Sequence, residues 1–480
     1  MRISKENMCK SIKKIVLWLF PVLFLIDDIL GFNGYQFTIC GKSIRIILAA
    51  ISVIVLGAYS VYVLYEERNS LFPGKICGKS LLNLLTPLDC FVCLFILGNF
   101  LWATLVPLAV RGEMTYALKD YSTVLVLVLY FPLSFLIRTD KLNLRTLEKI
   151  IYVLTLILAG WHCVMYVGET LHAGFYASYY DFIDIISFGT AVRSDVVYGY
   201  GITRIIQVTS PFLLPGVFLA IRYLLKGKYL HILSLVLFTF AICATFTKSI
   251  WFGYLFGLAA YLIPIAIMGK DTRTRLRSVL LFVLALSVIV ILNYTAFGNS
   301  VFQRAFNTIR SEESIANLQE QLKDIENGNL SEEEINNKRN ELKDALGTQE
   351  ANYKRAMQNK ALLSKWKQNP LFGFGYGSYT EECIRNEKYP YMYESTFPAL
   401  LMKIGLIGCV LWLAFIAVAT GTACSLFWKS KRSDVFWWLG TAISYALTVQ
   451  TNPFLFTFSG FSILLFLLIA CQEAGTYRRR

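Results

Sequence analysis

Residues 270–297 read KDTRTRLRSVLLFVLALSVIVILNYTAF, a basic run that leads into an uncharged apolar stretch over 279–297. A helix needs about 20 predominantly apolar residues to cross the hydrocarbon core of a bilayer. Basic residues at one end of such a helix favour the cytoplasmic side of the membrane. This stretch therefore predicts a membrane-spanning helix whose amino-terminal end faces the cytoplasm.

The composition extends this prediction to the whole chain. Of 480 residues, 56% are hydrophobic and only 16% are charged, whereas a soluble domain carries about 25% charged residues. A purely soluble protein and a disordered one are therefore both excluded. The net charge of +14 would indicate nucleic-acid binding in a soluble protein. In a membrane protein basic loops set the orientation instead, so we expect no nucleic-acid partner.

Further apolar runs bounded by charged residues lie on both sides of residues 279–297. Together they predict an all-α integral membrane protein with about 12 transmembrane helices. The first run is expected to be a retained anchor, because no small-residue cleavage site follows it. The predicted spans are Ile15–Gly31, Ile44–Tyr65, Leu82–Val110, Leu118–Ile137, Leu147–Gly168, Ile205–Leu225, Leu230–Thr247, Ile250–Met268, Val279–Phe297, Phe397–Trp428, Val435–Thr448 and Phe454–Cys471.

Lys and Arg are unevenly distributed among the segments that connect these spans. With the amino terminus in the cytoplasm, the inner segments hold 25 Lys and Arg and the short outer segments hold 7. Such asymmetry favours an N-in, C-in topology with an even number of spans. The chain then divides into residues 1–297 with helices 1–9, a large extracytoplasmic helical loop over 298–396, and residues 397–480 with helices 10–12.

The outer loop is polar, and apolar residues recur in it at spacings of three and four, as in amphipathic helices. We expect two short helices, over 311–328 and 331–347, and a third over 352–368. Gly347 stands where the second helix is expected to stop. The segment of about 311–350 resembles an insertion, and we expect it to form a mobile lid over the outer cavity.

The cysteines and histidines carry no recognisable site. Only Cys40 and Cys383 fall in predicted outer segments, so the 11 cysteines form no disulfide framework and no zinc-binding spacing. The three histidines are scattered along the chain. We therefore expect neither a metal nor a cofactor.

Three cations near the predicted outer membrane surface break the positive-inside pattern. Arg204 stands at the mouth of the sixth predicted span, Lys248 stands between the seventh and eighth, and Arg193 precedes them. Their simplest role is to extend toward lipid headgroups. The alternative is functional, because charges kept at the membrane face water or a polar partner. Several cations on one outer face would suit an anionic headgroup such as a diphosphate.

Two carboxylates are candidates for a general base. Glu394 stands just before the tenth predicted span, where a carboxylate can transfer protons or can simply favour a helix start. Asp28, next to Asp27 near the outer end of the first span, is the runner-up, and its alternative role is a polar helix end. Residues 369–379 read NPLFGFGYGSY, which lacks the Gly-Lys-Ser/Thr of a P-loop and is expected to be a flexible turn.

Within about residues 190–415, the sequence resembles the bacterial O-antigen polymerase and O-antigen ligase superfamily. Three blocks carry the resemblance. They are Arg204 followed by TSPFLLPG at 209–216, ATFTKSIWFGY at 244–254, and NPLFGFGYGSY followed by ESTFPALLMKIGLIG at 394–408. Lys248 replaces the Arg typical of the second block. Glu394-Ser395 replaces the His-Asn pair of the ligases, which favours the polysaccharide polymerase branch.

The resemblance implies an inverting, metal-independent glycosyl transfer at the outer face of the bacterial plasma membrane. The donor would be a glycan on a polyprenyl diphosphate, such as undecaprenyl diphosphate. The acceptor would be the non-reducing end of another lipid-linked repeat unit, as in O-antigen, capsule or exopolysaccharide synthesis. Glu394 would act on the acceptor hydroxyl, while Arg204 and Lys248 would stabilise the departing diphosphate. Weaker candidates for holding headgroup or glycan are Arg193, Arg310, Arg355 and Arg385.

Two alternatives remain. A ligase would use the same donor and a different acceptor. A flippase for lipid-linked oligosaccharides also suits 12 spans, although transporters usually show internal repeats and the sequence shows none. A flippase and a chain-length regulator are also possible partners of a polymerase.

Overall fold

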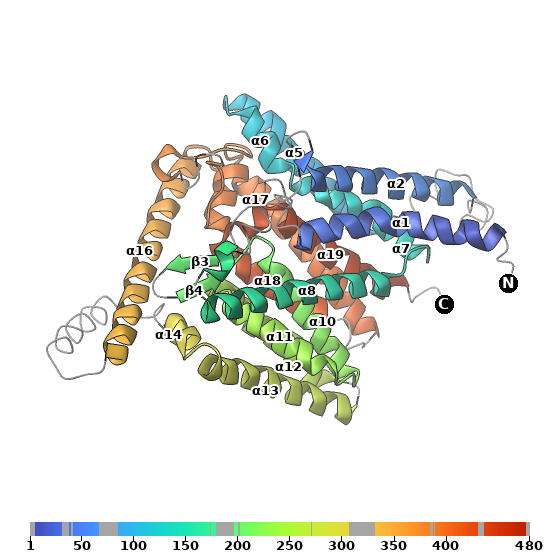
Figure 1. The fold of residues 1–480 in the computed structure, drawn as a ribbon. Helices are drawn as coiled ribbons and strands as arrows, with labels where there is room; N and C mark the ends of the chain where they lie inside the picture. Colours follow the sequence, from blue (N-terminus) through green and yellow to red (C-terminus); the bar gives the residue numbers. More distant parts are fainter. Residues whose placement is uncertain are drawn as a thin grey trace.

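The structure is a computed structural model, and the chain is almost entirely helical where it is described (Figure 1). Most of the helices lie side by side in one body, and a long helix, α16, crosses one end of it. The described residues are 5–30, 38–39, 42–66, 85–172, 174–178, 196–199, 202–269, 271–306, 332–384, 387, 389–430 and 436–476.

Each predicted span corresponds to a helix or to a group of short helices. The fourth predicted span is broken into α6, a 3-10 helix η2 and α7. In the first part of the chain the elements are α1 (Lys5–Leu30), α2 (Ile44–Glu66), α5 (Pro87–Ala109), α6 (Met114–Tyr121), η2 (Val124–Leu129), α7 (Tyr130–Arg138) and α8 (Leu144–Leu171). After them come η3 (Ser210–Phe212), α10 (Leu213–Leu225), α11 (His231–Ala244), α12 (Lys248–Met268), α13 (Thr272–Thr295) and α14 (Ser300–Phe306).

The last part of the chain returns to the helical body after α16. Its long helix α17 is interrupted at Gly405, whose backbone angles are not helical. The elements are α16 (Glu332–Gln368), η4 (Glu381–Cys383), α17 (Thr396–Ser430), α18 (Phe436–Thr448), η6 (Val449–Thr451), η7 (Pro453–Phe456) and α19 (Phe458–Thr476).

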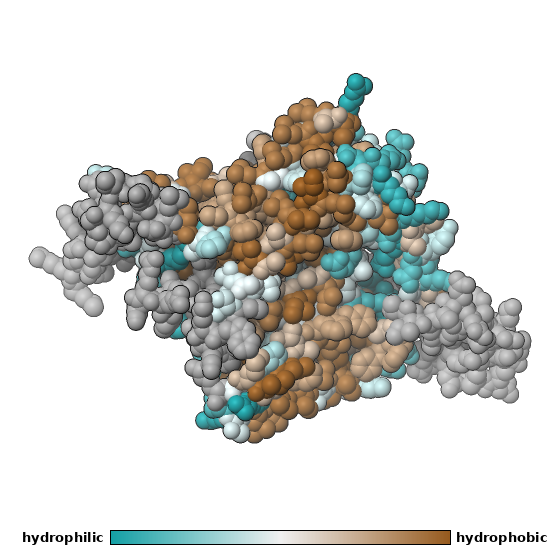
Figure 2. Space-filling model, turned by 180° about the vertical axis from the view of Figure 1, so that it is seen from behind, coloured by the Kyte–Doolittle hydropathy of each residue, from teal (hydrophilic) through white to brown (hydrophobic). Residues whose placement is uncertain are grey.

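The helical body is that of a multi-pass membrane protein. Seven segments are long and apolar enough to cross a bilayer, and three shorter apolar helices accompany them within the described residues. The all-α membrane class is thus confirmed, while the number of 12 spans stays a prediction. Figure 2 shows a broad hydrophobic surface over the body, with hydrophilic residues gathered toward one side. Exposed apolar side chains such as Leu105, Ile157 and Ile291 are expected where helices face lipid.

Two ion pairs, one buried and one partly buried, join helices at the ends that are predicted to be cytoplasmic. Asp89, in the first turn of α5, accepts hydrogen bonds from Tyr130 Oη at 2.8 Å and Arg138 Nη1 at 2.7 Å. Arg222 of α10 lies 2.6 Å from Glu148 of α8. Because an unpaired charge in such a place is costly, each pair fixes which helices are neighbours.

Two small hairpins depart from the all-α prediction. β1 (Thr38–Ile39) pairs with β2 (Lys42–Ser43), and β3 (Val196–Gly199) pairs antiparallel with β4 (Ile202–Ile205). The sixth span was predicted to begin at Ile205, and this is wrong, because that residue ends a strand. A short helical turn begins only at Ser210, followed by Pro211 at a position where proline starts helices well.

The predicted stop at Gly347 is also wrong. α16 is one continuous helix through this glycine, so the second and third predicted helices of the outer loop are a single element. Glycine costs a helix interior about 1 kcal/mol relative to alanine. Gly347 is buried, as are Ala345 and Thr348 near it. The helix predicted over 311–328 lies outside the described residues.

The segments that were predicted to lie outside meet at the end of the body that carries α16. Lys248, at the start of α12, contacts Thr348 of α16, and Tyr379 contacts Glu113 between α5 and α6. The start of α1 and the end of α19 lie at the opposite end of the body (Figure 1). This arrangement is what an even number of crossings would produce. The assignment of the α16 end to the cell exterior stays a prediction.

Candidate active site

Glu394 lies at the mouth of the helical body, two residues before α17 begins. Its Oε2 atom is 2.7 Å from Nε of Arg355 on α16, and its side chain is 20% exposed. Gln358, one turn further along α16, accepts hydrogen bonds from the backbone N–H groups of Glu394 and Ser395. The N–H of Ser395, directly before α17, is one of the donors that a helix start leaves without a partner in the helix. α16 therefore fixes both the carboxylate and the backbone that carries it.

The same face of α16 reaches Lys248. Nζ of this lysine donates to Oγ1 of Thr348 at 3.3 Å. Thr348 and Arg355 are seven residues apart, which is two helical turns or about 10 Å along one face. The structure thus brings together three residues that are far apart in the sequence. A carboxylate and two cations lie along one side of a single helix.

A strained turn positions Lys248 at the start of α12. Phe246 has a φ of 45°, which is rare for a bulky residue. Its carbonyl accepts a hydrogen bond from Nε of Arg304 at 3.1 Å, and its ring is fully buried. Thr247 Oγ1 donates to the carbonyl of Thr245 at 3.0 Å. Strain of this kind persists only where the surroundings enforce it, and it often marks functional sites.

Arg204 lies on β4, opposite Val197 of β3, and β4 packs against α8. Its side chain is half-buried. The hairpin lies at the same end of the body as α16 (Figure 1), so Arg204 shares that end with Lys248 and Glu394. Three weaker candidates, Arg193, Arg310 and Arg385, lie outside the described residues.

Asp28 occupies a different environment from Glu394. Its side chain is completely buried, and Oδ1 lies 3.0 Å from Oγ of Ser459 in α19 and 3.9 Å from Nη1 of Arg45 in α2. Asp27 beside it is also buried. A base must come within hydrogen-bond distance of the hydroxyl that it deprotonates. Glu394 is exposed enough for such contact and Asp28 is not, and the role of either carboxylate stays a prediction.

The glycine-rich stretch at 369–379 is not a flexible turn but a packed loop that fills the break in α17. The N–H groups of Leu406 and Ile407 donate to the carbonyls of Pro370 and Leu371. In return, the carbonyls of Met402 and Lys403 accept from the loop residues 374 and 375. Backbone polar groups at membrane depth must be satisfied within the protein. The loop supplies the hydrogen bonds that the helix loses at its break.

The glycines of this loop are required by its geometry. Gly373, Gly375 and Gly377 all have positive φ, and so does Gly405 in α17. A Cβ atom on Gly373 would lie 2.6 Å from the carbonyl oxygen of Met402, and one on Gly405 would lie 2.3 Å from that of Leu371. Loop and helix therefore approach each other as closely as glycine allows. The conformation of α17 around Gly405, eleven residues after Glu394, depends on this contact.

Sequence reasoning missed the charged pair that anchors this loop. Lys403 of α17 and Asp120 of α6 are both buried, with Nζ 2.6 Å from Oδ2. The same Oδ2 atom accepts the N–H of Gly377 at 2.9 Å. The ammonium group also lies 4.1 Å from the centroid of the Phe456 ring. The available signal was the charge of Lys403 inside an apolar span, because such charges need a partner.

A polar cavity of about 600 Å³ lies between α16 and the loop that follows the glycines. Tyr379, Glu381 and Lys365 are among its lining residues. Burial lowers the pKa of Lys365, and Glu381 partly opposes this effect. Lys365 also donates to the backbone carbonyl of Tyr379 and lies 5.2 Å from the centroid of the Phe374 ring. The cavity offers charged and aromatic groups outside the membrane-spanning helices.

The site combines a proton acceptor with cations. A carboxylate at the membrane surface can accept a proton from a hydroxyl group, and Lys and Arg beside it can bind an anionic leaving group. Among the described residues, no group of three or more His, Cys, Asp or Glu side chains could hold a metal ion. The arrangement is suited to group transfer from an anionic, membrane-bound donor.

Comparison with known proteins gives one family match. Residues 233–413 match the sequence model of the O-antigen ligase family. The match begins within α11 and ends within α17, so it includes Lys248, Arg355, Glu394 and the glycine loop. No curated protein and no solved structure matches the chain. The family match supports a membrane enzyme of O-antigen ligase or polymerase type, and it confirms the resemblance of this chain to the O-antigen ligase and polymerase superfamily.

Proposed function

We propose that the protein is a polysaccharide polymerase of the plasma membrane, which transfers a glycan from a polyprenyl diphosphate onto another lipid-linked repeat unit. The observation that supports it most is the Arg355–Glu394 pair, with Lys248 on the same face of α16. The Glu394-Ser395 sequence favours a polymerase over a ligase, since the ligases are expected to have His-Asn here. The family match, whose description is O-antigen ligase, keeps the ligase as the second candidate.

The proposed reaction is one displacement with inversion. The acceptor hydroxyl oxygen forms a bond to the anomeric carbon, and the bond from that carbon to the diphosphate breaks. The electron pair of the broken bond leaves with the polyprenyl diphosphate, and the hydroxyl proton passes to Glu394. Lys248 and Arg204 stabilise the charge that develops on the leaving group. The diphosphate is already activated, so the proposed reaction needs neither nucleotide nor metal.

The surrounding structure suggests roles for the remaining groups. Arg355 contacts the proposed base directly, so we assign it to orienting Glu394 as well as to contacting substrate. The polar cavity beside Tyr379 and Lys365 has space for sugar residues outside the membrane. Tyrosine rings offer flat amphipathic surfaces against which sugars can pack. We propose this cavity as the place where the acceptor glycan lies.

The test is the reaction of purified protein with lipid-linked repeat unit, read as a ladder of products. Glu394→Gln should lower turnover by about 10²-fold or more, the scale of general-base catalysis. Its melting temperature should stay close to that of the parent, because a partly exposed ion pair contributes only about 0–1 kcal/mol. Arg355→Lys is the matched control at the same pair, and it should retain more activity.

Three results would contradict the proposal. A normal ladder from Glu394→Gln would remove Glu394 as the base. Transfer to a lipid A-type acceptor, without transfer to a second repeat unit, would identify a ligase instead. Movement of the lipid-linked repeat unit across a vesicle membrane, without any new glycosidic bond, would identify a flippase.

A further inference from the structure

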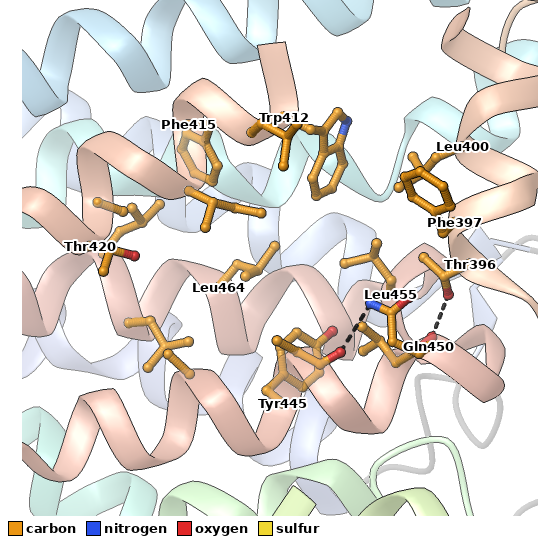
Figure 3. A pocket seen from close by; sticks show the side chains of 18 of the residues that line it. Thr396, Phe397, Leu400, Trp412, Phe415, Thr420, Tyr445, Gln450, Leu455 and Leu464 are labelled. Atoms are coloured by element: carbon orange, nitrogen blue, oxygen red, sulfur yellow. Dashed lines mark hydrogen bonds between the residues drawn. The ribbon is translucent and has the colours of Figure 1, made fainter. Parts of the chain in front are cut away.

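An apolar groove runs into the helical body from the Glu394 mouth. It lies between α17 and α18, each of which packs against α19 while making few contacts with the other. Figure 3 shows Trp412 and Phe415 of α17 on one side, Tyr445 of α18 on the other and Leu464 of α19 between them. The cavity volume is about 280 Å³. The groove therefore has two helical walls and a helical floor.

One end of the groove, at the right of Figure 3, adjoins the proposed active site. Its first lining residues are Thr396 and Phe397, directly after Glu394-Ser395. Thr396 Oγ1 donates to the carbonyl of Val449, which joins α17 to the segment that follows α18 at this end. Gln450 lies beside it (Figure 3). A tail that enters beside Glu394 can therefore lie in the groove while its head stays at the proposed site.

The length and the lining of the groove match a long hydrocarbon chain. It extends along α17 from Phe397 to Thr420, a helical path on the order of 30 Å at 1.5 Å per residue. This is close to the thickness of the hydrocarbon core of a bilayer, about 30 Å. Between its ends the lining is almost entirely aliphatic and aromatic. Leu413 and Ile416 along it are 63% and 52% exposed, so apolar surface is available for contact.

We infer that this groove between α17 and α18 binds the isoprenoid tail of the polyprenyl diphosphate donor and so directs its diphosphate toward the end of the body that carries Lys248 and Arg204. The inference rests on the proposed function for the identity of the donor. Burial of apolar tail contributes about 25 cal/mol per Å². A long tail held along the groove would add affinity without touching the reacting atoms. It would also prevent the donor from approaching with the wrong end toward the acceptor.

Two alanines in the groove wall allow it to be blocked at different depths. Ala446 of α18 lies near the mouth, and Ala419 of α17 lies near the far end. Each has a matched control on the same helix that is exposed but does not line the groove: Leu447 is the control for Ala446, and Ala417 is the control for Ala419. The variants are Ala446→Trp and Ala419→Trp, and the controls are Leu447→Trp and Ala417→Trp.

The measurement is the binding of undecaprenyl diphosphate, geranyl diphosphate and phosphatidylglycerol to the purified full chain, by native mass spectrometry. The parent should bind undecaprenyl diphosphate at least about tenfold more tightly than geranyl diphosphate, because the longer tail buries more apolar surface. Ala446→Trp should abolish this preference. Ala419→Trp should weaken binding of the long tail and leave that of the short one unchanged. Both controls should behave as the parent does.

Two outcomes would overturn the inference. One is equal tail preference in the blocked variants and their controls. The other is displacement of undecaprenyl diphosphate by phosphatidylglycerol at equal concentration, which would make the groove an ordinary site for membrane lipid. Binding requires no turnover, so its result is independent of the polymerase test. Tail-selective binding without a product ladder would contradict the proposed function alone, and a ladder without tail selectivity would contradict the groove alone.

Discussion

Removal of the Lys403 ammonium group should destabilise the protein strongly. Lys403 is 0% exposed and Asp120 is 1% exposed, and their charged atoms are 2.6 Å apart. The variant Lys403→Met keeps the volume of the side chain and leaves the Asp120 carboxylate with one described hydrogen bond, from the N–H of Gly377. Loss of one partner of a buried ion pair costs about 3–5 kcal/mol. We expect a loss of stability of this size.

A double-mutant cycle separates the pair from the packing around it. Asp120→Asn retains an oxygen for the N–H of Gly377 but leaves Lys403 as an unpaired buried cation, so it should also cost about 3–5 kcal/mol. The double variant contains no unpaired charge, so its loss should fall short of the sum of the single losses by at least about 1 kcal/mol. Unfolding in mixed micelles, followed by tryptophan fluorescence, gives the three free-energy differences.

The cycle also has a functional readout. If the pair only holds the glycine loop against α17, the double variant should recover turnover together with folded protein. Additive losses in stability would refute the reasoning, because they would show that Lys403 and Asp120 do not compensate each other. A double variant that is stable but inactive would instead assign one of the two charges to the chemistry.

Three further predictions follow from the site and the loop. Lys248→Ala should lower turnover by an order of magnitude or more, which is the scale of one lost transition-state donor, and Lys248→Arg should retain more turnover. Equal turnover in the parent and both variants would mean that Lys248 only anchors the helix in the headgroup region. Gly375→Ala should lower the melting temperature, because the φ of Gly375 is +86° and a Cβ atom there would lie 2.5 Å from the Pro107 ring. The control variant Gly57→Ala has open space around the added Cβ and should not lower the melting temperature. Tyr353 and Arg273 are both exposed, and each is replaced by cysteine in a cysteine-depleted background. An impermeant thiol reagent added outside the cell should label Tyr353→Cys and should not label Arg273→Cys. The reverse pattern would show that the predicted topology is inverted.

The sequence by itself determined the membrane class and the position of most helices. The transfer of an apolar run of sufficient length from water into a bilayer is favourable, whichever helices pack against it. This property is local, so each predicted span corresponds to a helix or to a group of short helices in the structure. The sequence also placed Glu394 at a helix start and singled out Lys248 and Arg204 by their charge. These predictions needed only the identity of the residue and its distance from an apolar run.

Tertiary structure alone decided which of these residues meet. Glu394 pairs with Arg355 across 39 residues, and Lys403 pairs with Asp120 across 283. The alternating glycines at 369–379 indicated a turn. That this segment packs into the break of α17 at Gly405 is visible only in the folded structure. Hydropathy predicts that a segment is buried in lipid or protein, but it does not predict which other segment packs against it. That choice depends on the complementary shapes and charges of surfaces that come together only in the folded chain.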